Sequence, residues 1–353
     1  MTETEIRNAL SAVKYPGFSR DIVSFGLVKS VSIEDGIVAV GIQIQTRDPK
    51  LCEQIFKDCH AALDDLAGGA EKVQIGIDIQ DPPGAPNAPG GVGGKQSLPG
   101  VKQIIAVASG KGGVGKSTVS SNLAVAFSRQ GLRVGLCDCD LYGPSIAHMF
   151  GVGDKQPLAD EQDRIIPIEA HGIKLMSMGF LLDDDSPVIV RGPLATRYTQ
   201  QFLQHVAWGD LDVLVLDLPP GTGDIQLTIV QTIALDGAVV VTTPQEVALI
   251  DARRAISMFA KVNVRILGLI ENMSWFECEH GTRYHLFGDG GGKREADRLH
   301  VPLLAQIPLD PETRRRCDEG KPVALLDPST SAVSQAFGEA AGSLASAALA
   351  PSH

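Results

Sequence analysis

The sequence predicts a doubly wound α/β domain with a mostly parallel sheet, preceded by a small α+β domain. Two observations support this prediction. Short, almost wholly apolar runs alternate with helical patterns, as strands buried on both faces of a parallel sheet do; they lie at 104–108, 134–137, 213–216, 238–241 and 266–270. A Pro- and Gly-rich stretch, 81–100, separates them from an N-terminal part with a different pattern. We therefore expect domains at 1–80 and 101–353, joined by a flexible linker.

The N-terminal part alternates in period two where strands are expected and in a helical period elsewhere. The order is helix, strand, strand, helix and strand, over 4–12, 27–33, 37–44, 51–66 and 73–79. About 80 residues of this kind make one helical layer on a small sheet. At the other end of the chain, the Ala- and Ser-rich segment 329–353 predicts a closing helix.

Composition excludes several classes of protein. The 353 residues include 31 Lys and Arg against 42 Asp and Glu, a net charge of −11 that disfavours sequence-independent binding of nucleic acid. No apolar run approaches the roughly 20 residues of a membrane-spanning helix, and no Lys or Arg follows Lys321 to form a basic membrane-binding tail. The N-terminus lacks a secretory signal, and six Cys are too sparse for a disulfide scaffold. We expect a cytoplasmic protein that binds neither nucleic acid nor membrane.

The strongest motif is a glycine-rich loop that follows the first predicted strand of the larger domain. It satisfies G-x-x-x-x-G-K-[ST] and opens a helical stretch over 118–129. In such a loop the backbone amides and the helix N-terminus surround phosphate oxygens, so we expect ATP to bind here. Lys116 should reach the β- and γ-phosphates, and the Ser117 hydroxyl should ligate Mg²⁺. The predicted binding residues are Gly110, Lys111, Gly112, Gly113, Val114, Gly115, Lys116, Ser117 and Thr118.

Acidic residues at the ends of two predicted strands complete the expected site. Asp138 and Asp140 follow the strand 134–137, and Asp217 follows 213–216. Since the carboxyl ends of parallel strands share one edge of the sheet, these carboxylates should face the phosphate loop. We expect Asp217 to hold the ligand shell of Mg²⁺ and Asp138 to support that shell without binding the ion directly. Asp140 should position or activate the attacking water.

Lys111 is a second lysine inside the loop. A loop of the form GKGGVGKST resembles the "deviant Walker A" loop of the class that includes nitrogenase iron protein, arsenite-pump ATPases and chromosome- and septum-positioning ATPases. The resemblance implies a homodimer in which Lys111 crosses to the partner's nucleotide and stabilises charge there, much as an arginine finger does. The alternative is a solvated lysine on a loop.

The match extends over most of the chain. Residues 102–325 resemble the Mrp/ApbC family of iron–sulfur cluster carrier ATPases, through GKGGVGKSTVSSNLA, VIVRGP, WGDLDVLVLDLPPGTGD and ENMSWF. Residues 1–80, with DIVSFGLVKSV, resemble a small domain associated with iron–sulfur assembly. The resemblance implies ATPase activity, a bound cluster, and cluster transfer to apoproteins or from assembly scaffold proteins. It also implies that Asn272 contacts adenine; from the residues alone, Asn272 is simply a turn former.

The chain departs from the family at the expected cluster site. Members usually carry C-x-x-C after ENMS and an aromatic residue, whereas here only Cys278 is present and Gly281 stands near the place of the second Cys. Four thiolates are the norm for such clusters, and a two-fold dimer would supply two. His280 or an added thiol such as glutathione could complete the set, or Cys278 could be inert.

Two functions compete on this basis. The first is an ATP-hydrolysing iron–sulfur carrier, with slow hydrolysis coupled to rearrangement of the dimer. The second is a nucleotide-switched interaction protein that controls docking of a partner and carries no cluster. A positioning ATPase acting on membrane or DNA has less support, because the chain is acidic and its tail lacks basic residues.

Overall fold

The computed structural model describes residues 2–16, 20–34, 37–45, 49–67, 69, 72–80, 95–181 and 202–348. The chain divides into two compact units, one made mainly of Met1–Gly93 and the other mainly of the residues from Gly94 onward; Ala159–Asp163 groups with the first. Within the described ranges, no helix is both long and apolar enough to cross a membrane.

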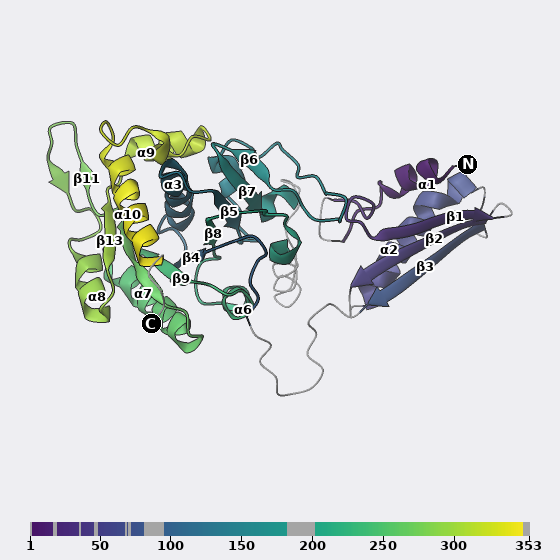
Figure 1. Ribbon diagram of the computed structural model, residues 1–353, viewed down its shortest axis with the longest axis horizontal. Coiled ribbons are helices and arrows are strands. Elements are labelled where there is room, and N and C mark those ends of the chain that lie inside the picture. Colours follow the sequence, from purple (N-terminus) through teal and green to yellow (C-terminus); the bar gives the residue numbers. More distant parts are fainter. Residues whose placement is uncertain are drawn as a thin grey trace. The chain divides into compact units, whose positions relative to one another are not determined.

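The first unit is a three-stranded sheet with helices packed on it (Figure 1). Strand β2 pairs antiparallel with β1 and parallel with β3. Helix α1 begins with a capping box, in which Thr2 and Glu5 each accept a hydrogen bond from the other's backbone amide. Cys59 lies on α2 and is fully buried, as core packing predicts. The elements are α1 Glu3–Leu10, β1 Val28–Glu34, β2 Ile37–Gln45, α2 Pro49–Ala67 and β3 Val73–Gln80.

The second unit is an eight-stranded sheet in the order β13-β10-β9-β4-β8-β5-β7-β6, parallel except for β6 at one edge. This confirms the predicted doubly wound fold. Every residue of β4, β5, β8 and β9 is buried, which explains their continuous apolar runs. The strands are β4 Ile104–Ser109, β5 Val134–Asp138, β6 Ile168–Ala170, β7 Ile173–Ser177, β8 Val213–Asp217, β9 Gly237–Thr242, β10 Ile266–Asn272 and β13 Leu303–Ile307.

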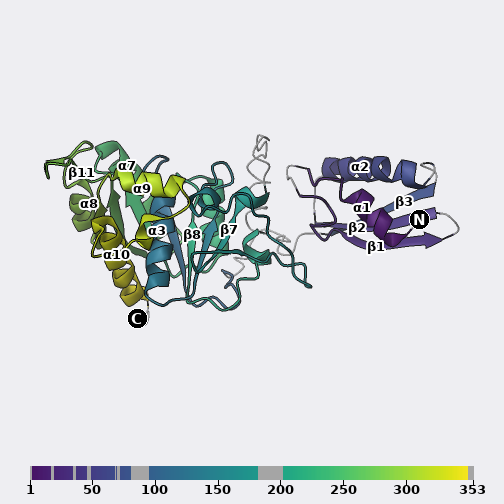
Figure 2. The ribbon, with the colours of Figure 1, turned by 90° about the horizontal axis from the view of Figure 1, so that it is seen from above.

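Helices cover both faces of this sheet, with α3 and α10 side by side on one face and α7 on the other (Figures 1 and 2). The closing helix α10 packs on α3, where Gln130 donates to the carbonyl of Gly338. The helices are α3 Lys116–Arg129, α4 Ile146–Met149, α6 Asp224–Thr232, α7 Glu246–Lys261, α8 Gly291–Leu299, α9 Pro311–Asp318 and α10 Ala332–Ala348. The described residues also include the 3₁₀ segments Met178–Leu181 and Val323–Leu325, and a short hairpin of β11 Phe276–Glu277 and β12 Arg283–Tyr284.

The predicted linker ends earlier than its composition indicates. Most of it, 81–94, lies outside the described residues, but 95–100 belongs to the second unit. There Gln96 pairs with Ile233 as a β-bridge, and Leu98 is buried. The predicted linker was wrong at this end. Its many Gly and Pro residues indicated a flexible coil, although the same segment contains the buried Leu98 and the backbone pairing of Gln96.

Two features position the site. Strand β4 lies between β8 and β9. The next strand in the chain, β5, lies on the β8 side of β4, whereas the later strands β9 and β10 lie on its other side. Ligands bind at such a switch point, beyond the carboxyl ends of the strands. The residues that end β4, β5, β8 and β10 therefore meet there.

Candidate functional site

The phosphate loop joins β4 to α3, and its geometry requires glycine at three of its four glycine positions, Gly110, Gly113 and Gly115. Gly113 and Gly115 have φ of +81° and +83°, in the left-handed region that favours glycine. A Cβ on Gly110 would lie 2.1 Å from the backbone of Asp251 in α7. Helix α3 begins at Lys116, two residues before the predicted start at Thr118, so the first turn of the helix contributes its amides to the loop. Gly112 and Gly113 are exposed.

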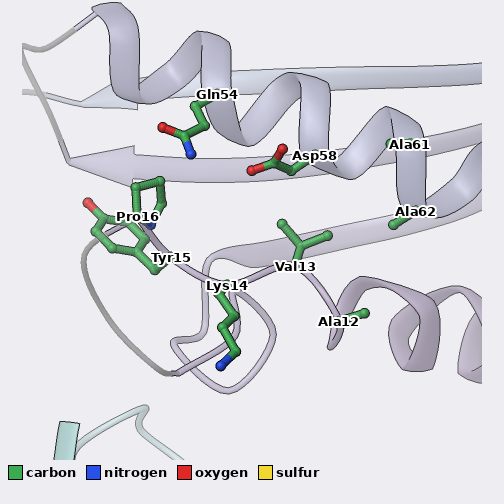
Figure 3. A pocket seen from close by; sticks show the side chains of 9 residues that line it. All are labelled: Ala12, Val13, Lys14, Tyr15, Pro16, Gln54, Asp58, Ala61 and Ala62. Atoms are coloured by element: carbon green, nitrogen blue, oxygen red, sulfur yellow. The ribbon is translucent and has the colours of Figure 1, made fainter. Parts of the chain in front are cut away.

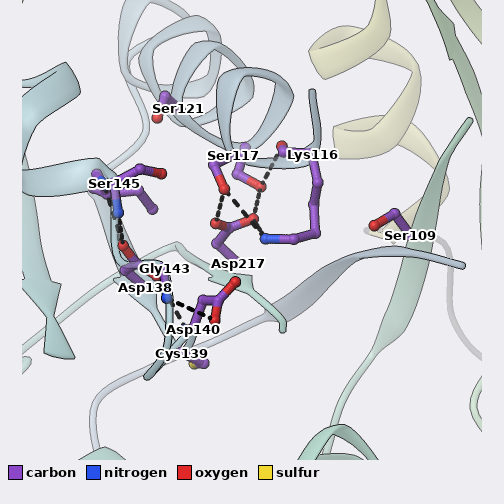
Figure 4. A network of polar contacts seen from close by, with 12 residues as sticks. Ser109, Lys116, Ser117, Ser121, Asp138, Cys139, Asp140, Gly143, Ser145 and Asp217 are labelled. Carbon is purple, nitrogen blue, oxygen red and sulfur yellow. Dashed lines mark hydrogen bonds and ion pairs between the residues drawn. The ribbon is translucent and has the colours of Figure 1, made fainter. Parts of the chain in front are cut away.

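Lys116 and Ser117 both contact Asp217, which ends β8 (Figure 4). The Lys116 ammonium lies 2.7 Å from Oδ1 of Asp217, and the Ser117 hydroxyl donates to Oδ2 at 2.6 Å. Asp217 is fully buried and Lys116 is 6% exposed. The parallel register places Asp217 beside Val107 of β4, which explains how a residue about a hundred positions away reaches the loop. A hydroxyl and a carboxylate are oxygen donors of the kind Mg²⁺ takes, so the residues present fit the ion.

Asp138 lies at the end of β5, in register with Asp217. Its Oδ2 accepts hydrogen bonds from the backbone amides of Ser145 and Ile146, at 2.9 and 3.1 Å, and from the Ser177 hydroxyl at 3.2 Å. Burial and the neighbouring Asp217 carboxylate raise its pKa from 3.8 to about 7, although the amides and the Lys116 ammonium oppose that rise. Asp138 therefore anchors the segment that carries Asp140; its action on Mg²⁺ stays a prediction.

Asp140 is half-buried and shapes the turn that follows it. Its Oδ1 accepts from the backbone amides of Tyr142 and Gly143, each at 3.2 Å, and Asp138 accepts from the amide of Asp140 itself (Figure 4). The side chain is thus held at the carboxyl edge of the sheet. Its action on an attacking water stays a prediction.

Lys111 is half-buried, and the carbonyl of the same residue accepts a hydrogen bond from the Ser109 hydroxyl at 2.9 Å. Its ammonium forms no ion pair with any residue that the structure describes. The backbone of Lys111 is therefore fixed while its charge is not neutralised within the described part of the chain. This arrangement is compatible with both sequence interpretations of Lys111.

Asn272 ends β10 and supports the backbone of the phosphate loop. Its Nδ2 donates to the carbonyl of Val114 at 2.9 Å, and the side chain is 7% exposed. A Cβ on Gly115 would lie 2.2 Å from the same nitrogen. Met273, the next residue, has φ of +55°, so the chain turns sharply there. The structure thus joins Asn272 to the loop backbone; its predicted contact with adenine is a separate prediction.

Cys278 lies in the turn of the hairpin formed by β11 and β12. Its amide donates to the carbonyl of Thr282, and its carbonyl accepts from the amide of Gly281, whose φ is +76°. Hydrogen bonds from the backbone amides of His280 and Thr282 lower the pKa of the thiol. Cys278 is half-buried, whereas the other five cysteines are buried. The described residues contain no group of three or more His, Cys, Asp or Glu that could hold a metal ion.

Two features of the structure were not predicted from the sequence. Ser120 lies one helical turn after Lys116 and donates to Oδ1 of Asp217 at 2.6 Å; the i, i+4 spacing from Lys116 was the available signal. The other is a shallow pocket of about 400 Å³ in the first unit, between 12–16 and one side of α2 (Figure 3). Lys14, Gln54 and Asp58 contribute its polar groups, and none of the predicted site residues lines it.

A glycine-rich loop between a central parallel strand and a helix, with its lysine and serine on a strand-end aspartate, defines a P-loop NTPase. The chain belongs to the NUBPL iron-transfer P-loop NTPase family, whose profile matches residues 100–345. A second family, described as iron–sulfur cluster assembly protein, matches residues 3–75. These matches confirm the resemblance derived from the motifs.

Relatives and solved structures agree with this assignment. An iron–sulfur cluster carrier protein of Deinococcus radiodurans is 44% identical over 96% of this chain and 93% of its own length. The Escherichia coli protein of the same name is 39% identical over 92% of this chain and 86% of its own length. A nucleotide-binding protein from Archaeoglobus fulgidus, solved with ADP, is 40% identical over 63% of this chain and 87% of its own, with a TM-score of 0.56. The cell division ATPase MinD of Pyrococcus furiosus is 25% identical. The match covers 69% of this chain and 98% of that protein, with a TM-score of 0.54.

Proposed function

We propose that this protein is an ATP-dependent carrier that binds an iron–sulfur cluster and transfers it to apoproteins. The proposal that it binds ATP is supported by one observation: Lys116 and Ser117 both contact Asp217 beside the glycine-rich loop. The proposal that it carries a cluster is supported by relatives named iron–sulfur cluster carrier proteins that align with nearly the whole chain. It is also supported by Cys278, which is half-buried whereas the other five cysteines are buried.

Nucleotide binding redistributes contacts that the chain already makes. Lys116 leaves Asp217 for the β- and γ-phosphates, and the loop amides around Gly113 surround phosphate oxygens. Ser117 and Asp217 would hold Mg²⁺, which neutralises phosphate charge when bound. Asp140 orients the attacking water from the anchored turn. We expect hydrolysis to be slow, because none of the site residues that the structure describes is a strong base.

A homodimer completes the site in this proposal. Lys111, which has no ion-pair partner in the described parts of its own chain, would reach the nucleotide of the partner subunit and stabilise charge there. The same dimer supplies two Cys278 thiolates to one cluster. The remaining coordination positions would be filled by His280, by an added thiol, or by a client protein. Such a site holds its cargo weakly, as transfer requires.

Asn272 connects the phosphate loop to the hairpin that carries Cys278. Asn272 contacts the loop through Val114, and Cys278 follows only six residues later. Between Asn272 and Cys278, the amide of Ser274 donates to the carbonyl of Ile307, the last residue of β13, and the carbonyl of Trp275 accepts from the amide of Leu309 just beyond it. We therefore propose that the nucleotide state of the loop reaches Cys278 through Asn272.

We place the carrier in the cytoplasm, because all six cysteines are free and a reducing compartment keeps thiols in that state. Its partners would be apoproteins that need a cluster, or scaffold proteins that assemble one. A nucleotide-switched interaction protein without cargo is favoured by a single observation, the presence of one Cys where clusters usually take more. The carrier relatives outweigh it.

Anaerobic reconstitution with iron and sulfide tests the cargo directly. Wild-type protein should bind iron and sulfide and show thiolate-to-iron absorbance, whereas Cys278→Ala should show neither. Cys317→Ala is the matched control, because Cys317 is buried and belongs to α9, not to the hairpin. Wild-type protein that stays colourless and free of iron would support the interaction protein instead.

A further inference from the structure

Asp217 accepts hydrogen bonds from three side chains of the first turns of α3. Lys116 and Ser120 donate to Oδ1, at 2.7 and 2.6 Å, and Ser117 donates to Oδ2 at 2.6 Å. Both Ser120 and Asp217 are fully buried. The Ser120 hydroxyl also lies 3.0 Å from the carbonyl of Lys116, so its one hydrogen is shared between two acceptors.

Two of these three partners have other tasks once a nucleotide binds. In the proposed function the Lys116 ammonium turns to the phosphates and withdraws its hydrogen bond from Oδ1 of Asp217, while the Ser117 oxygen turns to the metal. Ser120 lies deeper along the helix and is closed off from solvent, so it has no competing ligand. Mg²⁺ would then replace the charge of Lys116 at the carboxylate, but at Oδ1 the Ser120 hydroxyl is the one of these three donors that remains, and a buried acceptor without a donor is costly.

We propose that Ser120 is a positioning residue for the magnesium site. Its hydroxyl holds Oδ1 of Asp217 after Lys116 has left, which keeps Oδ2 turned toward the Ser117 hydroxyl and the metal. A hydrogen bond to a charged group is stronger than one to a neutral carbonyl, so the shared hydrogen shifts from the Lys116 carbonyl to Asp217. This inference rests on the proposed binding of magnesium nucleotide and adds a residue that the loop motif does not contain.

Ser121 provides a matched control on the same helix. It is equally buried, but its hydroxyl donates to the sulfur of Met149 at 3.5 Å. Figure 4 shows Ser121 apart from Asp217, with no contact between the two. Removing either hydroxyl makes the same chemical change in the same helix, and only one of the two changes touches Asp217.

The test measures the affinity of the full chain for a fluorescent ADP analogue with Mg²⁺ and with a chelator. The ratio of the two dissociation constants isolates the contribution of the metal. Ser120→Ala should lower this metal-dependent gain about tenfold, the loss expected for a charge-assisted hydrogen bond. Ser120→Thr, which keeps a hydroxyl, and Ser121→Ala should keep the wild-type ratio.

A second variant separates the hydrogen bond from packing. Ser120→Cys keeps the shape of the side chain but donates weakly, so it should lower the ratio as Ser120→Ala does. The inference is overturned if Ser120→Ala and Ser120→Cys keep the wild-type ratio, or if Ser121→Ala loses it equally. A wild-type chain whose ADP affinity does not respond to Mg²⁺ would instead refute the proposed nucleotide function, before any variant is compared.

Discussion

Lys116 and Asp217 form a buried ion pair with 2.7 Å between Nζ and Oδ1. The pair places the lysine that should bind phosphate on the carboxylate that should hold magnesium. Each charge therefore neutralises the other in the nucleotide-free chain, and both must be re-paired when nucleotide enters. Since the side chains are 6% and 0% exposed, water does little to compensate either charge.

This pair makes Lys116→Ala destabilising as well as inactivating. The substitution leaves the buried Asp217 carboxylate without its cation, which costs about 3–5 kcal/mol in comparable cases. Urea unfolding of the nucleotide-free chain measures the loss. The double variant Lys116→Ala/Asp217→Asn should recover much of the stability, because it removes the stranded charge. A single variant as stable as wild type would contradict this account of the pair.

Lys111 can be tested by mixing inactive subunits. Lys111→Ala and Lys116→Ala dimers should each lose ATP hydrolysis. In a mixed dimer, the subunit that carries the Lys111→Ala substitution keeps its own Lys116 and receives the partner subunit's Lys111, so one of two sites is complete. In an equal mixture half of the dimers are mixed, so activity should return toward about a quarter of the wild-type rate, measured by phosphate release. Mixed dimers as inactive as their parents would show that Lys111 does not act across the interface.

Asn272 should couple the nucleotide to Cys278. In the wild-type chain, saturating Mg-ADP should change the alkylation rate of Cys278, because Asn272 joins the loop to the segment leading into the hairpin. Asn272→Ala, measured at its own saturating nucleotide concentration, should lose that change. Peptide mass spectrometry follows the reaction, and the five buried cysteines serve as internal references. A nucleotide response that persists in Asn272→Ala would rule out this route.

The raised pKa of Asp138 predicts that the stability of the metal-free chain depends on pH. Its pKa is about 7 in the folded chain against 3.8 as a free side chain, so between these values the folded chain binds more protons. Stability should therefore fall as pH rises from about 4 to about 7 and remain lower above that range. Asp138→Asn removes the titrating group and should flatten this part of the profile in thermal melts. An equal slope in both proteins would assign the effect to other groups.

Gly115 should tolerate no side chain. Gly115→Ala would place a Cβ 2.2 Å from Nδ2 of Asn272 at φ of +83°, which adds a clash to about 1–3 kcal/mol of backbone strain. Gly112→Ala is the matched control, since its Cβ would meet nothing within 4 Å. Thermal melts should show a clear loss for the first and little change for the second. Equal melting temperatures would contradict the described geometry of the loop.

Features encoded in contiguous segments were predictable. The apolar runs predicted five strands of the larger sheet because burial on both faces demands apolar residues at every position. Strand β13 was missed because most of its residues are only half-buried. The short hairpin around Cys278 was missed because two-residue strands carry no periodicity.

The phosphate loop, the succession of strands and helices along the chain, and the aspartates at strand ends could all be predicted from the sequence, since each depends on neighbours along the chain. Only the tertiary structure shows which of these groups contact one another. Ser120 and Asp217 are 97 residues apart, and Asn272 and Val114 are 158 apart. Such pairs form because the order of strands in the sheet brings distant strand ends to one edge, and no local pattern records that order.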